Sequence, residues 1–229
     1  MLRVSICDDN REFLEVVCSF FDDKPQYRVR RFEQASAFLN EGGAESEIAI
    51  LDIHIADSSG IDLAMQIAGR NPACRVIFLS DYLSYATQVY DVPHVYFVLK
   101  SEMEERLPTA LEKCAAEIEQ SRENALPIRT SDSSAILRMD KIRYMERNLR
   151  ITRIYCEDTT YITKESVTAL IAKLDSRFCH CHSSYIVNLG WVRSVASGEL
   201  ILTTGEHIPV SRSHSRETQQ AFAEYWGGV

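Results

Sequence analysis

The stretch Ala49-Ile50-Leu51-Asp52-Ile53-His54-Ile55 is a short apolar run that contains one acid. Apolar runs of about four to eight residues between polar neighbours are typical of buried strands in a parallel sheet. A carboxylate in such a place is costly to bury unless it has a cation, a hydrogen-bond partner or a chemical task. We therefore take Asp52 as the centre of a functional site.

The first half of the chain alternates apolar runs with amphipathic stretches. Asn10 is placed to cap the first helix, because the apolar residues that follow it recur at helical spacing. This alternation predicts an α/β fold, a doubly wound five-stranded parallel sheet of the flavodoxin-like kind with helices on both faces. The strands are predicted at residues 2–7, 27–32, 48–51, 75–79 and 95–99, and the helices at 13–21, 35–39, 60–69, 84–90 and 103–118.

Polar residues follow four of these strands at the point where each strand ends. In doubly wound sheets ligands bind beyond the carboxyl ends of the strands. Carboxylates gathered there repel each other unless a cation joins them, and hard oxygen ligands suit Mg²⁺. A carboxylate can also accept a phosphoryl group, while an ammonium and a hydroxyl bind the phosphoryl oxygens. The residues concerned are Asp8, Asp9, Asp52, Ser80 and Lys100.

Residues 1–120 resemble the receiver domain of two-component response regulators. The resemblance rests on Asp8-Asp9, Leu51-Asp52-Ile53, Gly60, Ser80 and Lys100. It implies that Asp52 accepts phosphate from a sensor histidine kinase, with Lys100 and Ser80 at the phosphoryl group. It also implies that Mg²⁺ binds Asp8, Asp9, Asp52 and the backbone carbonyl of His54, and that Ser80 and Phe97 form a switch pair. Ile55-Ala56 and Lys100-Ser101 depart from the Met-Pro and Lys-Pro of that family, which affects loop geometry and phosphorylation rate.

Composition and charge set the broad class of the protein. A chain of 229 residues with 45% apolar content suggests two globular domains. Residues 1–120 hold 11 Lys/Arg and 21 Asp/Glu, a net charge of −10, whereas residues 121–229 hold 14 and 12, a net of +2. The acidic half does not attract nucleic acid, and the rear half permits its binding. The sequence shows no membrane-spanning run and no signal peptide, and its seven cysteines suit a reducing cytoplasm. We therefore expect a cytoplasmic protein.

The second half of the chain has a different pattern. Residues 121–127 are polar, end in proline and predict a linker, so that the second domain spans 128–229. Short apolar runs separated by glycines then predict a mostly antiparallel β domain with one clear helix over residues 164–174 and a short terminal helix over 221–226. A helix-turn-helix is not expected, so strands and loops would carry any contacts with DNA. The strands are predicted at residues 135–137, 142–145, 150–156, 160–163, 179–188, 192–196, 199–203 and 206–210.

Two stretches of this half resemble the LytTR-type DNA-binding domain over about residues 125–226. They are Phe178-Cys179-His180-Cys181-His182-Ser183-Ser184-Tyr185-Ile186-Val187-Asn188 and Ile208-Pro209-Val210-Ser211-Arg212-Ser213. The resemblance implies an elongated β fold whose loops enter successive major grooves, with contacts from Asn148, Arg150, Ser183 and Arg212. Arginine can pair bidentately with guanine and asparagine with adenine. That family often has Arg or Asn where this chain has Ser183-Ser184.

The interleaved Cys179-x-Cys181 and His180-x-His182 pairs suggest a zinc cluster. In a strand, however, the two cysteines face one way and the two histidines the other, so four tetrahedral ligands cannot converge. Buried thiols with outward imidazoles are expected instead. The His54 imidazole is likewise expected to point outward beside the Asp52 site rather than to bind a metal.

We interpret the chain as a phosphorylation-controlled transcriptional regulator and not an enzyme. Phosphorylation of Asp52 would favour a homodimer that binds repeated sites in double-stranded DNA. One alternative is a receiver-controlled interaction module that does not bind DNA, which the small net charge of the rear half favours. Another is a phosphohydrolase of the haloacid-dehalogenase kind, but those enzymes carry Asp-x-Asp on the first strand. Here the acid follows the third strand, and His54 stands at the second-acid position.

Overall fold

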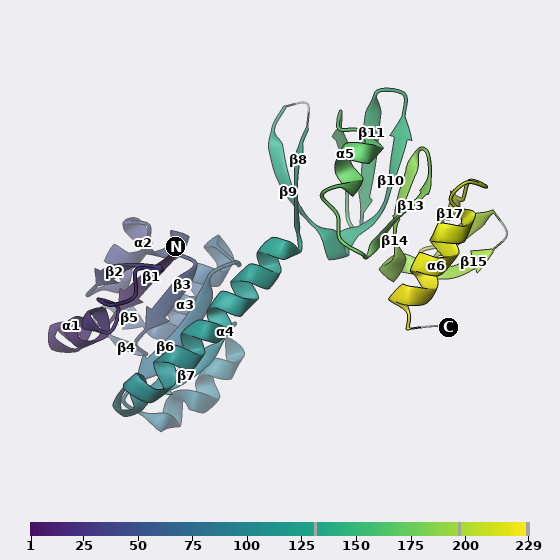
Figure 1. The fold of residues 1–229 in the computed structure, drawn as a ribbon. Coiled ribbons are helices and arrows are strands. Elements are labelled where there is room, and N and C mark those ends of the chain that lie inside the picture. Colours follow the sequence, from purple (N-terminus) through teal and green to yellow (C-terminus); the bar gives the residue numbers. More distant parts are fainter. Residues whose placement is uncertain (131, 197, 228–229) are drawn as a thin grey trace. The chain divides into compact units, whose positions relative to one another are not determined.

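The computed structural model describes residues 1–130, 132–196 and 198–227, and in residues 86, 88, 90 and 91 it describes the backbone only. The chain divides into two compact units, Met1–Arg122 and Glu123–Val229 (Figure 1). Each unit has two hydrophobic core clusters of its own. No helix in the described part of the chain combines the length and the apolar composition that crossing a bilayer requires.

The first unit is built on a parallel sheet of five strands, as the sequence predicts. Its strand order is β2-β1-β3-β6-β7, so the order reverses between β1 and β3. The carboxyl ends of these two strands therefore form the switch point at which ligands bind in such sheets. The strands are β1 (Leu2–Cys7), β2 (Tyr27–Phe32), β3 (Ile48–Leu51), β6 (Arg75–Ser80) and β7 (Tyr96–Leu99).

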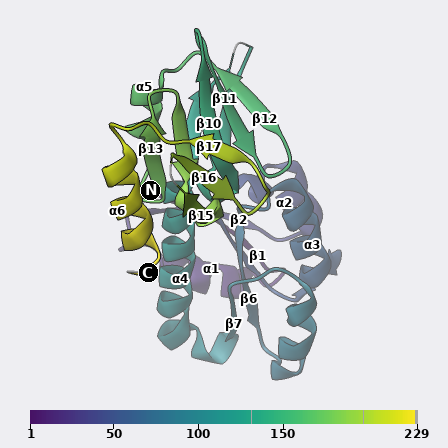
Figure 2. The ribbon, with the colours of Figure 1, turned by 90° about the vertical axis from the view of Figure 1, so that its right-hand side faces the viewer.

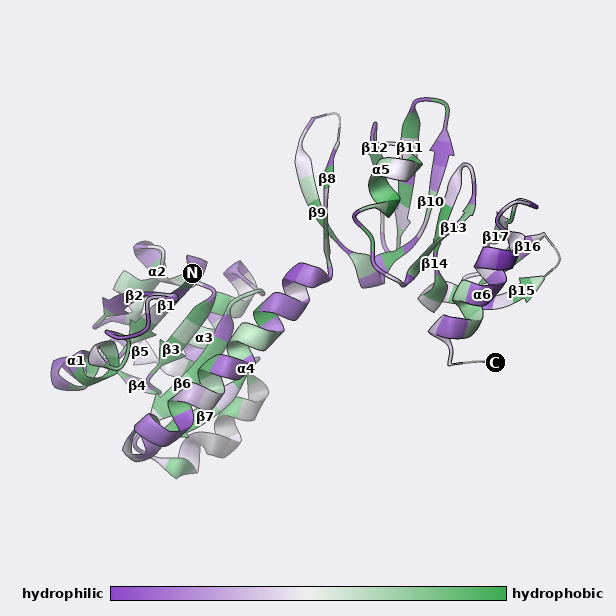
Figure 3. Ribbon diagram, in the orientation of Figure 1, coloured by the Kyte–Doolittle hydropathy of each residue, from purple (hydrophilic) through white to green (hydrophobic). Residues whose placement is uncertain are grey.

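Helices cover both faces of this sheet. The helices α1 (Arg11–Ser19) and α4 (Met103–Glu123) pack on one face, and α2 (Ala35–Asn40) and α3 (Gly60–Arg70) pack on the other (Figure 2). Alternate residues of β3 enter the two cores, which is why that strand is apolar throughout and the centre of the sheet is hydrophobic (Figure 3). The remaining elements are the hairpin β4 (His54–Ile55) and β5 (Ser58–Ser59) and the 3₁₀ helices η1 (Gly43–Glu45), η2 (Leu83–Asp91) and η3 (Lys100–Glu102).

Two caps fix where helices begin beside the sheet edge. The Asn10 side chain accepts a hydrogen bond from the backbone N–H of Phe13 at 3.1 Å, which confirms its predicted capping role. Ser59 caps α3 in the same way through the N–H of Ile61 at 3.1 Å. The expected helix at 84–90 forms the 3₁₀ helix η2 instead. Val92, which precedes a proline, has extended backbone angles and ends it.

The second unit is mostly antiparallel β structure, as predicted. A five-stranded sheet has the order β12-β11-β10-β14-β13, and a three-stranded sheet has the order β15-β16-β17. The strands are β8 (Ala125–Arg129), β9 (Ser134–Arg138), β10 (Ile142–Asn148), β11 (Ile151–Cys156), β12 (Thr160–Thr163), β13 (Phe178–His182), β14 (Tyr185–Asn188), β15 (Val192–Ala196), β16 (Glu199–Leu202) and β17 (His207–Pro209), and the helices are η4 (Met139–Lys141), α5 (Val167–Ile171), η5 (Leu189–Trp191) and α6 (Ser215–Tyr225).

The stretch predicted as one strand over residues 179–188 is a hairpin of β13 and β14. The backbone N–H of Ser184 donates to Nδ1 of His182 at 3.1 Å and closes the turn between them. This turn is formed by Ser183-Ser184 and contains neither glycine nor proline, so the local signal for it is weak. Ser183 consequently lies at a hairpin tip rather than within a strand.

The two helices of this unit also differ from their predicted bounds. Helix α5 ends at Ile171, because the chain then tightens into i→i−3 turns, in which the N–H of Lys173 donates to the carbonyl of Leu170 and the N–H of Leu174 to that of Ile171. Helix α6 begins at Ser215, ahead of the predicted residue 221. The prediction missed its first turn, because the residues of that turn are polar and show no apolar spacing. The side chain of Thr218 from that turn is nevertheless buried against β13, where Cys179 Sγ donates to its Oγ1 at 3.7 Å.

The division between the two units, after Arg122, falls within the residues expected to form a linker. Residues 121–123 complete α4, where the Ser121 hydroxyl donates to the carbonyl of Glu117 at 2.7 Å. Residues 125–127 begin β8, and Leu126 is fully buried in the core of the second unit. Only Asn124 separates the helix from the strand. The connection between the units is therefore made by the end of a helix and the start of a strand.

A substitution at Gly60 tests how closely α3 approaches the sheet edge. A Cβ at Gly60 would lie 1.8 Å from the backbone oxygen of Asp52, whereas a Cβ at Gly69 in the same helix would meet nothing within 4 Å. We expect Gly60→Ala to lower the free energy of unfolding by about 2 kcal/mol or more in urea titrations. Gly69→Ala should leave it unchanged or raise it by about 0.5–1 kcal/mol. Equal effects of the two variants would contradict this packing.

Candidate functional site

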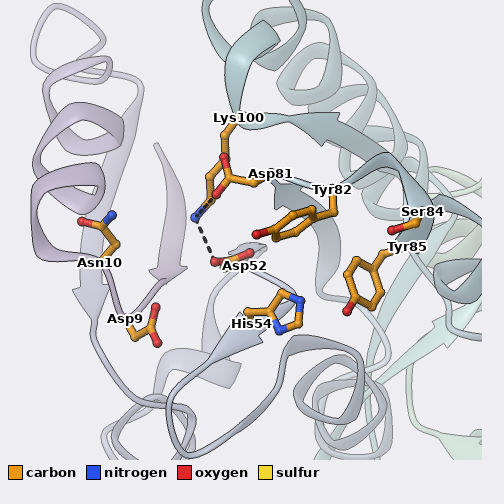
Figure 4. Close-up of a pocket in the computed structure, with 9 residues that line it drawn as sticks. All are labelled: Asp9, Asn10, Asp52, His54, Asp81, Tyr82, Ser84, Tyr85 and Lys100. Carbon is orange, nitrogen blue, oxygen red and sulfur yellow. Dashed lines mark hydrogen bonds and ion pairs between the residues drawn. The ribbon is translucent and has the colours of Figure 1, made fainter.

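The sheet places the predicted site residues side by side at one edge. Asp8 follows β1, Asp52 follows β3, and Lys100 follows β7. The backbone N–H of Asp52 donates to the carbonyl of Cys7 at 2.9 Å, which continues the β1–β3 pairing beyond its last strand residues. The side chains of Asp9, Asp52 and Lys100 surround one pocket (Figure 4).

Lys100 joins the two buried carboxylates. Its Nζ lies 2.6 Å from Oδ2 of Asp8 and 2.8 Å from Oδ2 of Asp52, and the three side chains are only 3–8% exposed. Desolvation acts to lower the pKa of Lys100, but the hydrogen bonds to Asp52 and Asp8 outweigh it and raise that pKa. Burial raises the pKa of Asp8. The ring of Phe13 lies 4.5 Å from the same Nζ and covers it from the α1 side.

The three acids could together hold a divalent cation. Carboxylate oxygens of Asp8, Asp9 and Asp52 lie within 4.8 Å of one another. The Asp52 carboxylate is oriented at both ends, since Oδ1 accepts from the N–H of Ile53 at 2.7 Å and Oδ2 from Lys100. Asp8 Oδ1 accepts from the N–H of Asn10 at 2.9 Å. Fixed carboxylate oxygens at this spacing match the hard ligands that Mg²⁺ and Ca²⁺ take.

The other predicted residues of this site are also at the edge. Ser80 ends β6 and is buried, and its Oγ accepts from the N–H of Tyr82 at 3.3 Å. Phe97 lies on the adjacent strand β7, half-buried and packed against the core on the α2–α3 side. Their role as a switch pair stays a prediction.

The His54 imidazole lies beside the pocket, as expected. Its ring centroid is 4.9 Å from that of Tyr85 and 5.9 Å from that of Tyr82, both in edge-to-face contact (Figure 4). The sequence did not single out these two tyrosines, because Tyr82 lies between the predicted strand and helix and Tyr85 lies within the helix predicted at 84–90. No peptide bond in the described ranges is cis, and Lys100-Ser101 instead opens η3.

Asp81 is a pocket residue that sequence reasoning did not identify. It directly follows β6, and its Oδ2 lies 3.9 Å from Nζ of Lys100 while its side chain is 65% exposed. The signal that could have found it is the one used for the other acids, namely a carboxylate at the carboxyl end of a strand. It adds negative charge to a pocket that already holds Asp9 and Asp52.

The four residues expected to contact DNA all lie exposed on loops or strand ends of the second unit. Asn148 ends β10, Arg150 is in the β10–β11 turn, Ser183 is in the β13–β14 turn, and Arg212 follows β17. Two hydrogen bonds join these segments. The N–H of Arg147 donates to the carbonyl of Ser184 at 2.7 Å, and the N–H of Ser211 donates to that of Cys181 at 3.0 Å. The structure therefore brings the three segments together.

The cysteines of β13 face the core. Burial raises the pKa of the Cys181 thiol to about 12, and Cys179 is buried beside Thr218. The imidazoles of His180 and His182 are half-buried, and the His180 ring packs on that of His214 with centroids 4.7 Å apart. The predicted burial of the thiols is confirmed, whereas His180 points outward less than expected, since its Nε2 atom is buried.

Two family models match the chain. The response regulator receiver domain matches residues 4–112, and the LytTr DNA-binding domain matches residues 132–223. The sensory transduction protein LytT of Enterococcus faecalis is 26% identical over 96% of this chain and 98% of its own length. The accessory gene regulator protein A of Staphylococcus epidermidis is 25% identical over 88% of this chain and 92% of its own. A solved LytTr DNA-binding domain from Bacillus cereus has 24% identity and a TM-score of 0.39, covering 43% of this chain and 95% of that one.

The lysine bridge predicts how stability responds to a divalent cation. Lys100→Met leaves the Asp8 and Asp52 carboxylates buried without their counter-charge, so we expect a loss of about 3–5 kcal/mol in the free energy of unfolding with EDTA present. Saturating Mg²⁺ should restore more stability in this variant than it adds to the wild type, because the ion no longer competes with an ammonium.

Urea titrations with and without Mg²⁺ measure both effects. Lys113→Met, which removes an exposed lysine from α4, is the matched control and should behave like the wild type. An equal gain from Mg²⁺ in all three proteins would show that the ion does not bind beside Lys100.

Proposed function

The chain belongs to the two-component response regulators in which a receiver domain precedes a LytTR DNA-binding domain, and on this basis we propose how its two sites act. A receiver domain implies a histidine kinase as partner, and a LytTR domain implies binding to DNA. Both matched families consist of regulators rather than enzymes. We propose that Asp52 is the phosphoacceptor, that Mg²⁺ is the cation, and that phosphorylation controls binding of a homodimer to repeated DNA sites in the cytoplasm.

The observation that carries this proposal is the fixed Asp52 carboxylate. With Oδ1 held by the N–H of Ile53 and Oδ2 by Lys100, an oxygen of Asp52 is oriented to attack phosphorus. The new P–O bond forms as the P–N bond of the phosphohistidine breaks, and the proton on the departing imidazole comes from solvent. Lys100 then donates to a phosphoryl oxygen in place of the carboxylate. Mg²⁺ held by Asp8, Asp9, Asp52 and the carbonyl of His54 would neutralise charge on the transferring group.

Ser80 and Phe97 would report the phosphoryl group to the rest of the domain. The Ser80 hydroxyl accepts a long hydrogen bond from the N–H of Tyr82, at 3.3 Å, and as an acceptor there it keeps its own proton to donate to a phosphoryl oxygen. Its movement would let the half-buried ring of Phe97 turn inward. Moving a population from 1:99 to 99:1 requires the active packing to bind the group by about 5.5 kcal/mol more tightly. Lys100, Ser80 and the cation are the groups that can supply this difference.

The output half would contact DNA through its loops. Asn148, Arg150, Ser183 and Arg212 are exposed on segments that lie together, and such side chains can reach base edges. Relatives of this chain include proteins named as a transcriptional regulatory protein and as sensory transduction proteins. Repeated sites follow from a dimer, because each copy presents one set of loops.

A second candidate function is a receiver-controlled protein-interaction module without DNA binding. It is favoured by the net charge of only +2 in residues 121–229 and by the internal pairing of several cations there. Arg143 pairs with Glu206, Arg177 with Asp175, and Lys141 with Glu157. These pairs reduce the positive charge available to phosphates.

Phosphotransfer is tested at Asp52. With acetyl phosphate and Mg²⁺ as donor, Asp52→Asn should incorporate no acid-labile phosphate, while its circular dichroism and unfolding transition stay native. Asp62→Asn, which changes an exposed acid in the first turn of α3, should be labelled like the wild type. Label on the Asp52 variant would place the acceptor elsewhere.

DNA recognition is tested by selecting bound sequences from random duplexes, with and without acetyl phosphate and Mg²⁺. We expect a paired repeat one or two helical turns apart, enriched by phosphorylation. Arg212→Ala should weaken binding to it by about 1–3 kcal/mol, or roughly 5- to 150-fold. Arg138→Ala removes the same charge from a residue paired with Asp140 and should matter little. Absence of any enriched sequence at low salt would favour the interaction module.

A further inference from the structure

Leu149, at the tip of the β10–β11 hairpin, has two unfavourable properties at once. Its backbone has a φ of 52°, and it is the one residue other than glycine with positive φ within residues 1–130, 132–196 and 198–227. Its side chain is 91% exposed. A leucine is strained in the left-handed region, where glycine or asparagine is easier to place, and an exposed leucine gains nothing from burial. Neither property helps the domain to fold.

The surrounding structure holds this conformation in place. Asn148 pairs with Ile151, so that Leu149 and Arg150 form a two-residue turn. The Arg147 guanidinium donates to the carbonyl of Leu149 at 3.1 Å and to that of Glu165 at 2.7 Å. The Thr152 hydroxyl donates to the same Glu165 carbonyl at 2.7 Å. The turn is thereby tied to the segment before α5, and its leucine is presented on a fixed backbone.

Strain that the rest of a structure maintains marks a position with a task outside the fold. A single exposed leucine is ordinary on a protein surface, and only its combination with an enforced positive φ sets this one apart. Its neighbours on both sides in the sequence, Asn148 and Arg150, are exposed polar residues, which favours a polar partner surface over an apolar one. The turn presents one apolar side chain, that of Leu149, between the amide of Asn148 and the guanidinium of Arg150. The base edge of a T·A pair in the major groove is complementary to this set. There the C5-methyl of thymine is an apolar group beside hydrogen-bonding atoms.

We propose that Leu149 is a specificity-determining residue that contacts a thymine methyl group. This inference rests on the proposed DNA binding, and it adds recognition of a base through an apolar contact rather than a hydrogen bond. Arg147 is a positioning residue, because its hydrogen bonds to the carbonyls of Leu149 and Glu165 fix the backbone that carries the leucine side chain. The guanidinium of Arg147 is thus used for hydrogen bonds within the domain rather than for contact with a phosphate.

The test removes only the methyl group. Fluorescein-labelled duplexes of the selected site are prepared with deoxyuridine in place of thymidine at one position at a time, and binding of the full phosphorylated chain is measured by anisotropy. The loss of one buried methyl group predicts about fourfold weaker binding by the wild type at one position of each half-site. Leu149→Gly should bind the thymidine site more weakly and show no difference between the thymidine and deoxyuridine duplexes. Because glycine prefers positive φ, this variant should unfold at the same or higher urea concentration.

Ile136→Ala is the control, since it removes a different side chain that is 77% exposed, on β9. It should keep the full sensitivity to deoxyuridine. Wild-type binding that is indifferent to deoxyuridine at every position, or a Leu149→Gly variant that stays as sensitive as the wild type, would overturn the inference while leaving DNA binding intact. Absence of binding to any duplex at low salt would overturn the proposed function, and this inference with it.

Discussion

The ion pairs between Lys100 and the carboxylates of Asp8 and Asp52 are the interaction on which the first unit depends. The core residues of the strands behind them are mostly apolar and cannot replace the water that these charges lose. Charges at this edge are therefore tolerable only as a complete set, because each buried member left alone would be strongly destabilising. Two neighbouring residues support the arrangement of Lys100, Asp8 and Asp52. Asn10 begins α1 beside Asp8, and Gly60 lets α3 approach the backbone of Asp52. If a new anion accepts one of the hydrogen bonds of Lys100, the charge balance at Asp8 and Asp52 changes together.

The second unit solves a different problem, which is to hold several loops in register without a large core. It does so with side chains that bond to the backbone of other segments. Arg147 ties the β10–β11 turn to the stretch before α5. Asn188 donates to the carbonyls of Met139 and Ile142 at 3.2 and 2.8 Å and anchors the start of β10. Such bonds specify where the loops lie, whereas the apolar cores specify only that the sheets pack.

The sequence predicted the features that have a strong periodic or positional signal. Buried parallel strands appear as apolar runs, and the acids and the lysine at their ends follow from position alone, so the fold of the first unit and the meeting of Asp8, Asp52 and Lys100 could be foreseen. The β13–β14 turn could not, because Ser183-Ser184 lacks the glycine or proline that marks a break. Asp81 could have been found from its place at the end of β6, whereas Tyr82 and Tyr85 lie at the start of the irregular 3₁₀ segment η2, where no periodic pattern places side chains at the pocket. The conformation of Leu149 is enforced by Arg147 and Glu165, the second of which is distant in sequence, so no local pattern reveals it.

The internal pairing of cations in the second unit has a consequence for how the protein moves through a cell. Attraction to random duplex DNA depends on the number of cations that displace counterions from phosphates, and that attraction rises or falls steeply with their number. Arg143, Arg147 and Arg177 are occupied within the fold, and the unit as a whole is almost neutral. A regulator of this kind would spend little time sliding along unrelated sequences. Most of its molecules would remain in solution, where they can encounter a kinase, and only the matched site would retain them.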